Sequence, residues 1–142
     1  MTMKFSVRSE AKLNTCCTQL QDICAKALSY GVFDFSIIEG HRTIERQKEL
    51  YDEGKSQLDG VIKKGKHNHL PSLAVDILPY PSKINGVNVW EDKQRFCVLA
   101  GLMYAAAREL GYNIRWGGDW DGDGNNADST FHDLPHFEII NS

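Results

Sequence analysis

Residues 69–76 read HLPSLAVD, and residues 133–138 near the C-terminus read DLPHFE. The first stretch supplies an imidazole, His69, and a carboxylate, Asp76, seven positions apart. The second supplies His136, with Asp133 three residues before it. Two histidines and one aspartate form a ligand set that suits zinc and leaves a fourth coordination position for water. The remaining carboxylate, Asp133, is then available to act on that water as a base.

Two of these polar residues lie in segments that are otherwise apolar. Asp76 interrupts the run AVDIL at residues 74–78, and His136 is followed by Phe137 and Ile139. A buried carboxylate without a partner is costly in free energy. Because a shared cation would relieve that cost for both segments, the sequence favours a metal site that joins them.

Length and composition describe an ordinary globular chain. The 142 residues are enough for one domain with its own core, and we expect a single domain over residues 1–142. The apolar fraction is 42%, the charged fraction is 25% and the net charge is −3. This balance gives no argument for nucleic acid as a partner. The first eight residues do not resemble a signal peptide, and no window is apolar over the length of a membrane span.

Hydrophobic periodicity predicts an α+β fold, with a small, mostly antiparallel sheet packed against two longer helices and the zinc site on the sheet. An Asn85-Gly86 pair predicts a small hairpin, and Gly111 is expected to end the last helix. The predicted helices span residues 9–30, 44–51 and 92–110, and the predicted strands span residues 32–38, 74–78, 113–116 and 135–140.

The four cysteines show no metal-binding spacing. Cys16, Cys17 and Cys24 fall within the first predicted helix, and Cys97 lies in the last one. We expect the first three to behave as small buried hydrophobic residues in a reducing compartment.

Taken together, the motifs resemble those of the LAS-type zinc peptidases. This group includes D-alanyl-D-alanine carboxypeptidases and dipeptidases, and the L-alanyl-D-glutamate endopeptidases that phages use as endolysins. Residues 69–76 resemble its HxxGxAxD signature, and residues 133–138 resemble its second zinc motif. Residues 39–51 are similar to its SGYRS…Q..LY segment, and residues 115–120 (RWGGDW) to a run of the endopeptidase branch. The match covers residues 36–139, with four motifs in the family's order.

The resemblance implies a role for each matching residue. His69, Asp76 and His136 would hold zinc, and Asp133 would be the general base. Arg42 would steady the substrate carbonyl and the oxyanion that develops from it, a role that suits a fixed guanidinium.

Two positions depart from the family pattern. Ser72 stands where the family usually has glycine, and His67 stands where serine is usual. His67 is therefore a rival to His69 as a ligand. Glu138 could share the pocket or form a structural pair, and His132 is left without a role.

A second metal site is suggested by residues 119–124, which read DWDGDG. Asp119, Asp121 and Asp123 match the opening of a calcium-binding loop, although the twelfth position is Thr130 instead of glutamate. Calcium binding and a merely acidic turn remain alternatives.

The resemblance implies hydrolysis of the L-alanyl-D-glutamate bond in the peptidoglycan stem peptide by a monomeric phage endolysin. We expect synthesis in the host cytoplasm and release to the wall through a holin-type pore, without membrane insertion. Two alternatives stay open: a D-alanyl-D-alanine carboxypeptidase or dipeptidase with the same zinc centre, and a non-catalytic cell-wall-binding domain.

Overall fold

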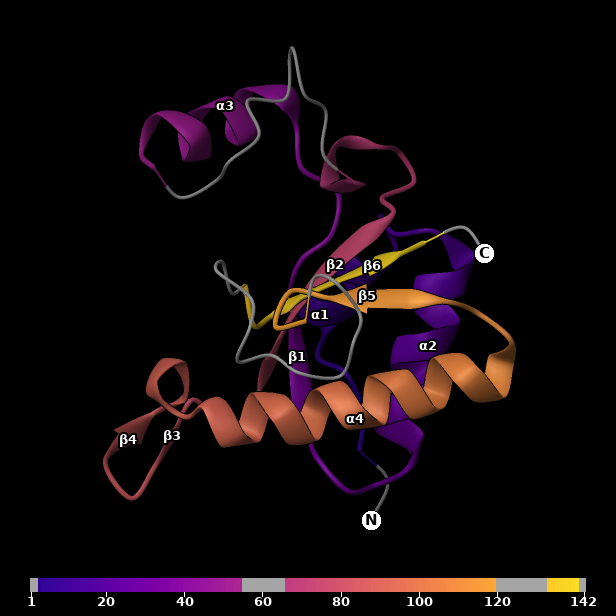
Figure 1. Cartoon of the computed structure of the whole chain (residues 1–142), viewed down its shortest axis with the longest axis vertical. Coiled ribbons are helices and arrows are strands. Elements are labelled where there is room, and N and C mark those ends of the chain that lie inside the picture. Colours follow the sequence, from indigo (N-terminus) through magenta and orange to yellow (C-terminus); the bar gives the residue numbers. More distant parts are fainter. Residues whose placement is uncertain (1–2, 55–65, 120–132, 141–142) are drawn as a thin grey trace.

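The fold is built around a four-stranded antiparallel sheet. The computed structural model describes residues 3–54, 66–119 and 133–140. Its strands are β1 (Phe35–Glu39), β2 (Ala74–Pro79), β5 (Ile114–Trp116) and β6 (His136–Ile139), in the order β1-β2-β6-β5. The first and last strands of the chain therefore belong to the same sheet (Figure 1). The predicted α+β class and the antiparallel sheet are confirmed.

Helices and a small hairpin complete the described part of the fold. The helices are α1 (Val7–Leu13), α2 (Thr18–Ser29), α3 (Ile44–Asp52) and α4 (Lys93–Leu110), with short 3-10 turns η1 (Lys66–Asn68) and η2 (Val89–Glu91). Strands β3 (Lys83–Ile84) and β4 (Val87–Asn88) form the predicted hairpin, with Asn85 and Gly86 both at positive φ. Gly111 ends α4 in the left-handed conformation, as predicted.

The single helix predicted over residues 9–30 is wrong, because the chain breaks between α1 and α2. At the break, the backbone is hydrogen-bonded to a distant loop: Ser72 N–H donates to the Thr15 carbonyl at 2.8 Å, and Cys17 N–H donates to the Ser72 carbonyl at 2.9 Å. These bonds replace helical ones, and they attach the segment that precedes β2 to the N-terminal helices. Periodicity continues across the break because both sides face the same core.

The two longer helices, α2 and α4, cover one face of the sheet (Figure 1). Strand residues alternate between faces, so Val75, Ile77 and Phe137 enter the hydrophobic core. Cys16, Cys17 and Cys24 are buried in the same core, as predicted, whereas Cys97 is exposed. Burial raises the pKa of the Cys16 thiol to about 12, which fits an unreactive core residue.

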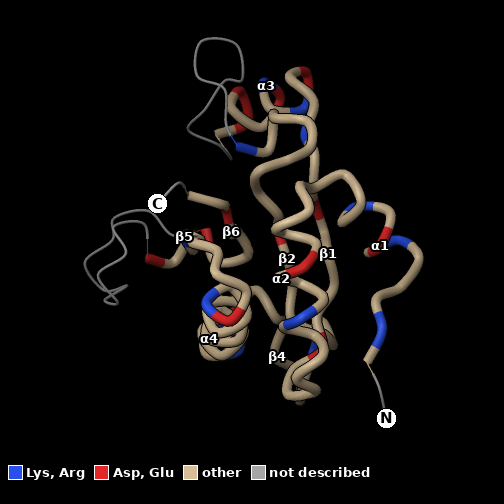
Figure 2. Tube along the Cα trace, turned by 90° about the vertical axis from the view of Figure 1, so that its right-hand side faces the viewer, with Lys and Arg blue, Asp and Glu red and all other residues tan. Residues whose placement is uncertain are grey.

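The opposite face of the sheet carries polar side chains. Asp76 and His136 are direct partners across β2 and β6, and Glu138 lies opposite both Ala74 on β2 and Arg115 on β5. In Figure 2, α3 stands at one end of the molecule and carries charges of both signs. None of the helices among residues 3–54, 66–119 and 133–140 has the length and apolarity needed to cross a membrane.

Candidate metal centre

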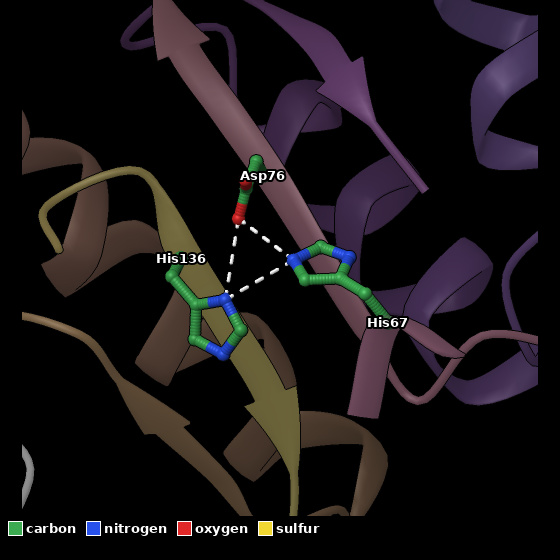
Figure 3. A group of neighbouring side chains, drawn as sticks. All are labelled: His67, Asp76 and His136. Carbon is green, nitrogen blue, oxygen red and sulfur yellow. Dashed lines mark hydrogen bonds and ion pairs between the residues drawn. The ribbon is translucent and has the colours of Figure 1, made fainter. Parts of the chain in front are cut away.

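Three side chains with ligand atoms converge on the polar face of the sheet: His67, Asp76 and His136 (Figure 3). His67 Nε2 lies 3.1 Å from Asp76 Oδ1 and 3.2 Å from His136 Nδ1. His136 Nδ1 lies 3.3 Å from Asp76 Oδ1. The three atoms thus form a nearly equilateral triangle, and all three residues are buried. The predicted membership of Asp76 and His136 in one polar cluster agrees with this geometry.

The structure brings His67, and not the predicted His69, into this cluster. His69 is exposed, and its carbonyl oxygen lies 3.0 Å from His41 Nδ1. His67, by contrast, is 4% exposed and points into the cluster. The chain folds back after η1, where Leu73 N–H donates to the Lys66 carbonyl at 3.0 Å. This turn brings His67 close to β2. The histidine beside Asp76 is therefore nine positions before it, whereas the resemblance implied a spacing of seven.

Each imidazole is oriented by a hydrogen bond on the side away from the triangle. His67 Nδ1 lies 2.8 Å from the Gly40 carbonyl, which only accepts, so Nδ1 carries the hydrogen and Nε2 presents its lone pair to the cluster. His136 Nε2 lies 2.8 Å from Glu138 Oε1, which orients Nδ1 inward in the same way. Such outer contacts fix the tautomer and ring orientation of metal-binding histidines.

Gly40, whose carbonyl contacts His67, lies where a side chain would not fit. A Cβ at this position would lie 2.3 Å from Thr15 Oγ1 and 2.4 Å from the Lys12 carbonyl oxygen. The end of β1 therefore packs directly on the end of α1. The next residues close around the same turn, because Arg42 N–H donates to the His67 carbonyl at 2.7 Å.

The charges in the cluster shift the pKa values of their neighbours. Burial would raise the pKa of Asp76, but the two imidazoles outweigh burial and hold its pKa well below the ordinary range. Burial would lower the pKa of His136, but its hydrogen bonds with Asp76 and Glu138 outweigh burial and raise its pKa to about 9. The site is therefore built to concentrate positive charge, supplied by protons or by a cation. Two inward nitrogen lone pairs and one carboxylate oxygen fit a divalent metal.

Asp133 lies three residues before the start of β6. Its N–H donates to the Gly117 carbonyl at 2.8 Å, and its own carbonyl accepts from His136 N–H at 3.0 Å. A Cβ on Gly117 would lie 2.0 Å from the Asp133 carbonyl oxygen, so a glycine is required for this close approach. Gly117, the residue that follows β5, is thereby held against Asp133.

The pKa of the Asp133 carboxyl group depends on the charges of the cluster. Burial raises the pKa of Asp133, and the negative charge of Asp76 raises it further. The positive charges of His136, His67 and Arg42 oppose that rise. A carboxyl group with a raised pKa beside a candidate metal site is suited to exchange protons there.

Arg42 is a fixed cation next to Asp76. Its Nε and Nη2 donate to the two carboxylate oxygens of Glu39 at 2.8 and 2.7 Å. Nη1 donates to Gln47 Oε1 at 2.8 Å, and Nη2 lies 3.6 Å from Asp76 Oδ2. A paired, bidentate guanidinium of this kind has little rotational freedom. The structure thus brings Arg42 to the site at which the sequence predicted it.

Sequence reasoning missed the residues that orient this arginine. Gln47 is 1% exposed although α3 is otherwise polar, and a register shift after Ile37 places Glu39 opposite Asp76. A glutamine at a helix position that faces the protein was a weak signal in the sequence. The register shift left no signal.

The candidate calcium loop falls largely outside the described residues. Asp119 is described, and it is buried three positions after the end of β5. Asp121, Asp123 and His132 lie outside the described ranges. Calcium binding at Asp119, Asp121 and Asp123 therefore stays a prediction.

Comparison with known proteins places this geometry in context. The family model described as phage L-alanyl-D-glutamate peptidase matches residues 1–140. The chain is 32% identical to the L-alanyl-D-glutamate peptidase of Escherichia phage T5 over 143 residues, which cover 99% of this chain and all of that protein. It is 28% identical to the peptidoglycan L-alanyl-D-glutamate endopeptidase CwlK of Bacillus subtilis, over 82% of this chain and 66% of CwlK.

A solved structure has the same fold. The crystal structure of the Serratia marcescens L-Ala D-Glu endopeptidase ChiX superimposes with a TM-score of 0.76 at 32% sequence identity. The alignment covers 98% of this chain and 91% of that one.

Proposed function

This chain belongs to the family of phage L-alanyl-D-glutamate peptidases, and we propose that it hydrolyses the L-alanyl-D-glutamate bond in the stem peptide of bacterial peptidoglycan. We further propose that it uses one zinc ion held by His67 Nε2, Asp76 Oδ1 and His136 Nδ1. The observation that carries the metal proposal is the convergence of these three atoms within 3.3 Å of one another, with both rings oriented from behind.

The donor set supports zinc over harder cations. Two imidazoles and one carboxylate are a common catalytic zinc set, whereas magnesium and calcium take mainly oxygen ligands. When bound, zinc would act as a Lewis acid and make an attacking water more acidic. His67, Asp76 and His136 would hold the ion.

The remaining site residues supply proton transfer and charge stabilisation. Asp133 would accept a proton from the attacking water at its carboxylate, and would then donate that proton to the leaving amine of D-glutamate. Its raised pKa supports both steps, because the protonated form is stabilised by burial. Arg42, fixed by Glu39 and Gln47, would donate a hydrogen bond to the carbonyl oxygen as negative charge develops there.

We also propose that the chain acts in host cell lysis as a single-domain monomer, and its relation to a phage enzyme supports the lytic role. In that role the protein would be made in the host cytoplasm and would reach the wall through a holin-type pore. Calcium at Asp119, Asp121 and Asp123 would be regulatory.

Mass spectrometry of a defined muropeptide tests the reaction. After incubation with the zinc-loaded protein, we expect one fragment that ends in L-alanine and one that begins with a free amino group on D-glutamate. Release of terminal D-alanine would instead show a carboxypeptidase. Binding of the muropeptide without any new amino group would show a wall-binding domain, and either result would overturn the proposal.

A further inference from the structure

A second charged group lies directly behind His136, on the side away from Asp76. Glu138 Oε1 lies 2.8 Å from His136 Nε2, and Glu138 Oε2 lies 3.3 Å from Arg115 Nη2 and 3.8 Å from Lys66 Nζ. Glu138 and Arg115 are direct partners across β6 and β5. The two oxygens of Glu138 therefore have different partners: Oε1 contacts the imidazole, and Oε2 contacts two cations.

Lys66 connects this group to the opposite ligand. It immediately precedes His67, and its Nζ donates to the Ile139 carbonyl as well as pairing with Glu138. The Lys66 side chain thus spans from η1, which carries His67, to β6, which carries His136. Because Leu73 N–H donates to the Lys66 carbonyl, the backbone of Lys66 is also held where β2 begins.

We propose that Glu138, clamped by Lys66 and Arg115, is a positioning residue that makes His136 present Nδ1 to the metal. This inference rests on the proposed zinc site and adds three residues to it. Glu138 acts through His136: its carboxylate only accepts hydrogen bonds, so His136 Nε2 must carry the hydrogen and Nδ1 must be the lone-pair nitrogen.

The same geometry argues against Glu138 as the base that activates water. Oε1 contacts Nε2, whereas the ligand triangle is formed by the Nδ1 side of the same ring. The imidazole therefore stands between Glu138 and the proposed metal position. The Glu138 side chain is also only 9% exposed, and its carboxylate already contacts two cations and one imidazole ring.

The clamp makes a carboxylate necessary at this position, and an amide of the same shape insufficient. In Glu138→Gln, Lys66 and Arg115 would attract the single amide oxygen, which turns the NH2 group toward His136 Nε2. That group donates, so the ring would be driven to the tautomer with hydrogen on Nδ1, which opposes metal binding. Glu138→Gln thus changes hydrogen-bond polarity with almost no change in volume.

Zinc affinity, measured by competition with a chelating dye, tests this proposal. Glu138→Gln is expected to bind zinc roughly 10–100-fold more weakly than the unmodified chain, the usual effect of losing an outer partner of a metal-binding histidine. Adding Arg115→Met to Glu138→Gln should recover part of the loss, because one of the cations that turn the amide is removed. The matched control is Glu109→Gln, which removes an exposed carboxylate 3.1 Å from Lys26 on the surface, and its zinc affinity should be unchanged.

Imidazole nitrogen-15 spectra of the zinc-loaded, unmodified chain give a readout that needs no variant to fold. They should show His136 bound through Nδ1 with hydrogen on Nε2. Zinc bound through Nε2 of His136, an unchanged affinity in Glu138→Gln, or no recovery in the double variant would overturn the proposal. Absence of zinc binding in the unmodified chain would overturn the proposed metal site itself, so the two failures are distinguishable.

Discussion

Replacement of Asp133 by asparagine is expected to lower kcat for stem-peptide hydrolysis by about 10²–10⁴-fold, the usual contribution of a general acid–base group. The amide is nearly isosteric with the carboxyl, but it cannot accept the proton of the attacking water or return it to the leaving amine. The backbone contacts of Asp133 with Gly117 and His136 do not involve the side chain, so they should persist. Steady-state kinetics on a defined muropeptide would measure the loss.

Two further measurements separate loss of chemistry from loss of structure. Asp133→Asn should retain one equivalent of zinc and unfold at a temperature close to that of the unmodified chain. Asp22→Asn, an exposed aspartate on α2, serves as the matched control and should keep full activity. If Asp133→Asn hydrolysed the substrate at a near-normal rate, proton transfer would have to be assigned to another group.

His67→Ala is expected to abolish both zinc binding and activity, whereas His69→Ala should preserve both. The first change removes one of the three proposed ligands. Asp76 and His136 alone would give the zinc ion an incomplete coordination shell. The second change removes an exposed ring outside the triangle. Elemental analysis of dialysed protein would find about one equivalent of zinc in His69→Ala and far less in His67→Ala. The reverse result would restore the assignment that the seven-residue spacing suggested.

The positions of Asp76 and His136 could be predicted, because a polar residue inside an apolar strand costs free energy unless it has a partner. Asp76 and His136 interrupt apolar strands, and strand alternation directs both to the face opposite Val75 and Phe137. The cross-strand partnership of Asp76 with His136 then follows from antiparallel pairing. The helix end at Gly111 was equally readable, because local chemistry alone decides it.

The rest depends on how the chain folds between its regular elements. The turn that joins Lys66 to Leu73 places His67, and not His69, beside Asp76, and no periodicity extends through that turn. The break between α1 and α2 has the same origin, since it is stabilised by bonds to the distant Ser72 backbone. The partners of Arg42 depend on a register shift in β1. Each of these is a tertiary contact, and single-sequence patterns carry little information about such contacts.

Diffraction at the zinc absorption edge from crystals of the zinc-loaded chain tests the position of the ion, because anomalous scattering locates zinc independently of activity. We expect one strong peak at bonding distance, about 2.0–2.2 Å, from His67 Nε2, Asp76 Oδ1 and His136 Nδ1. A peak coordinated by His69, or no peak between β2 and β6, would contradict this expectation.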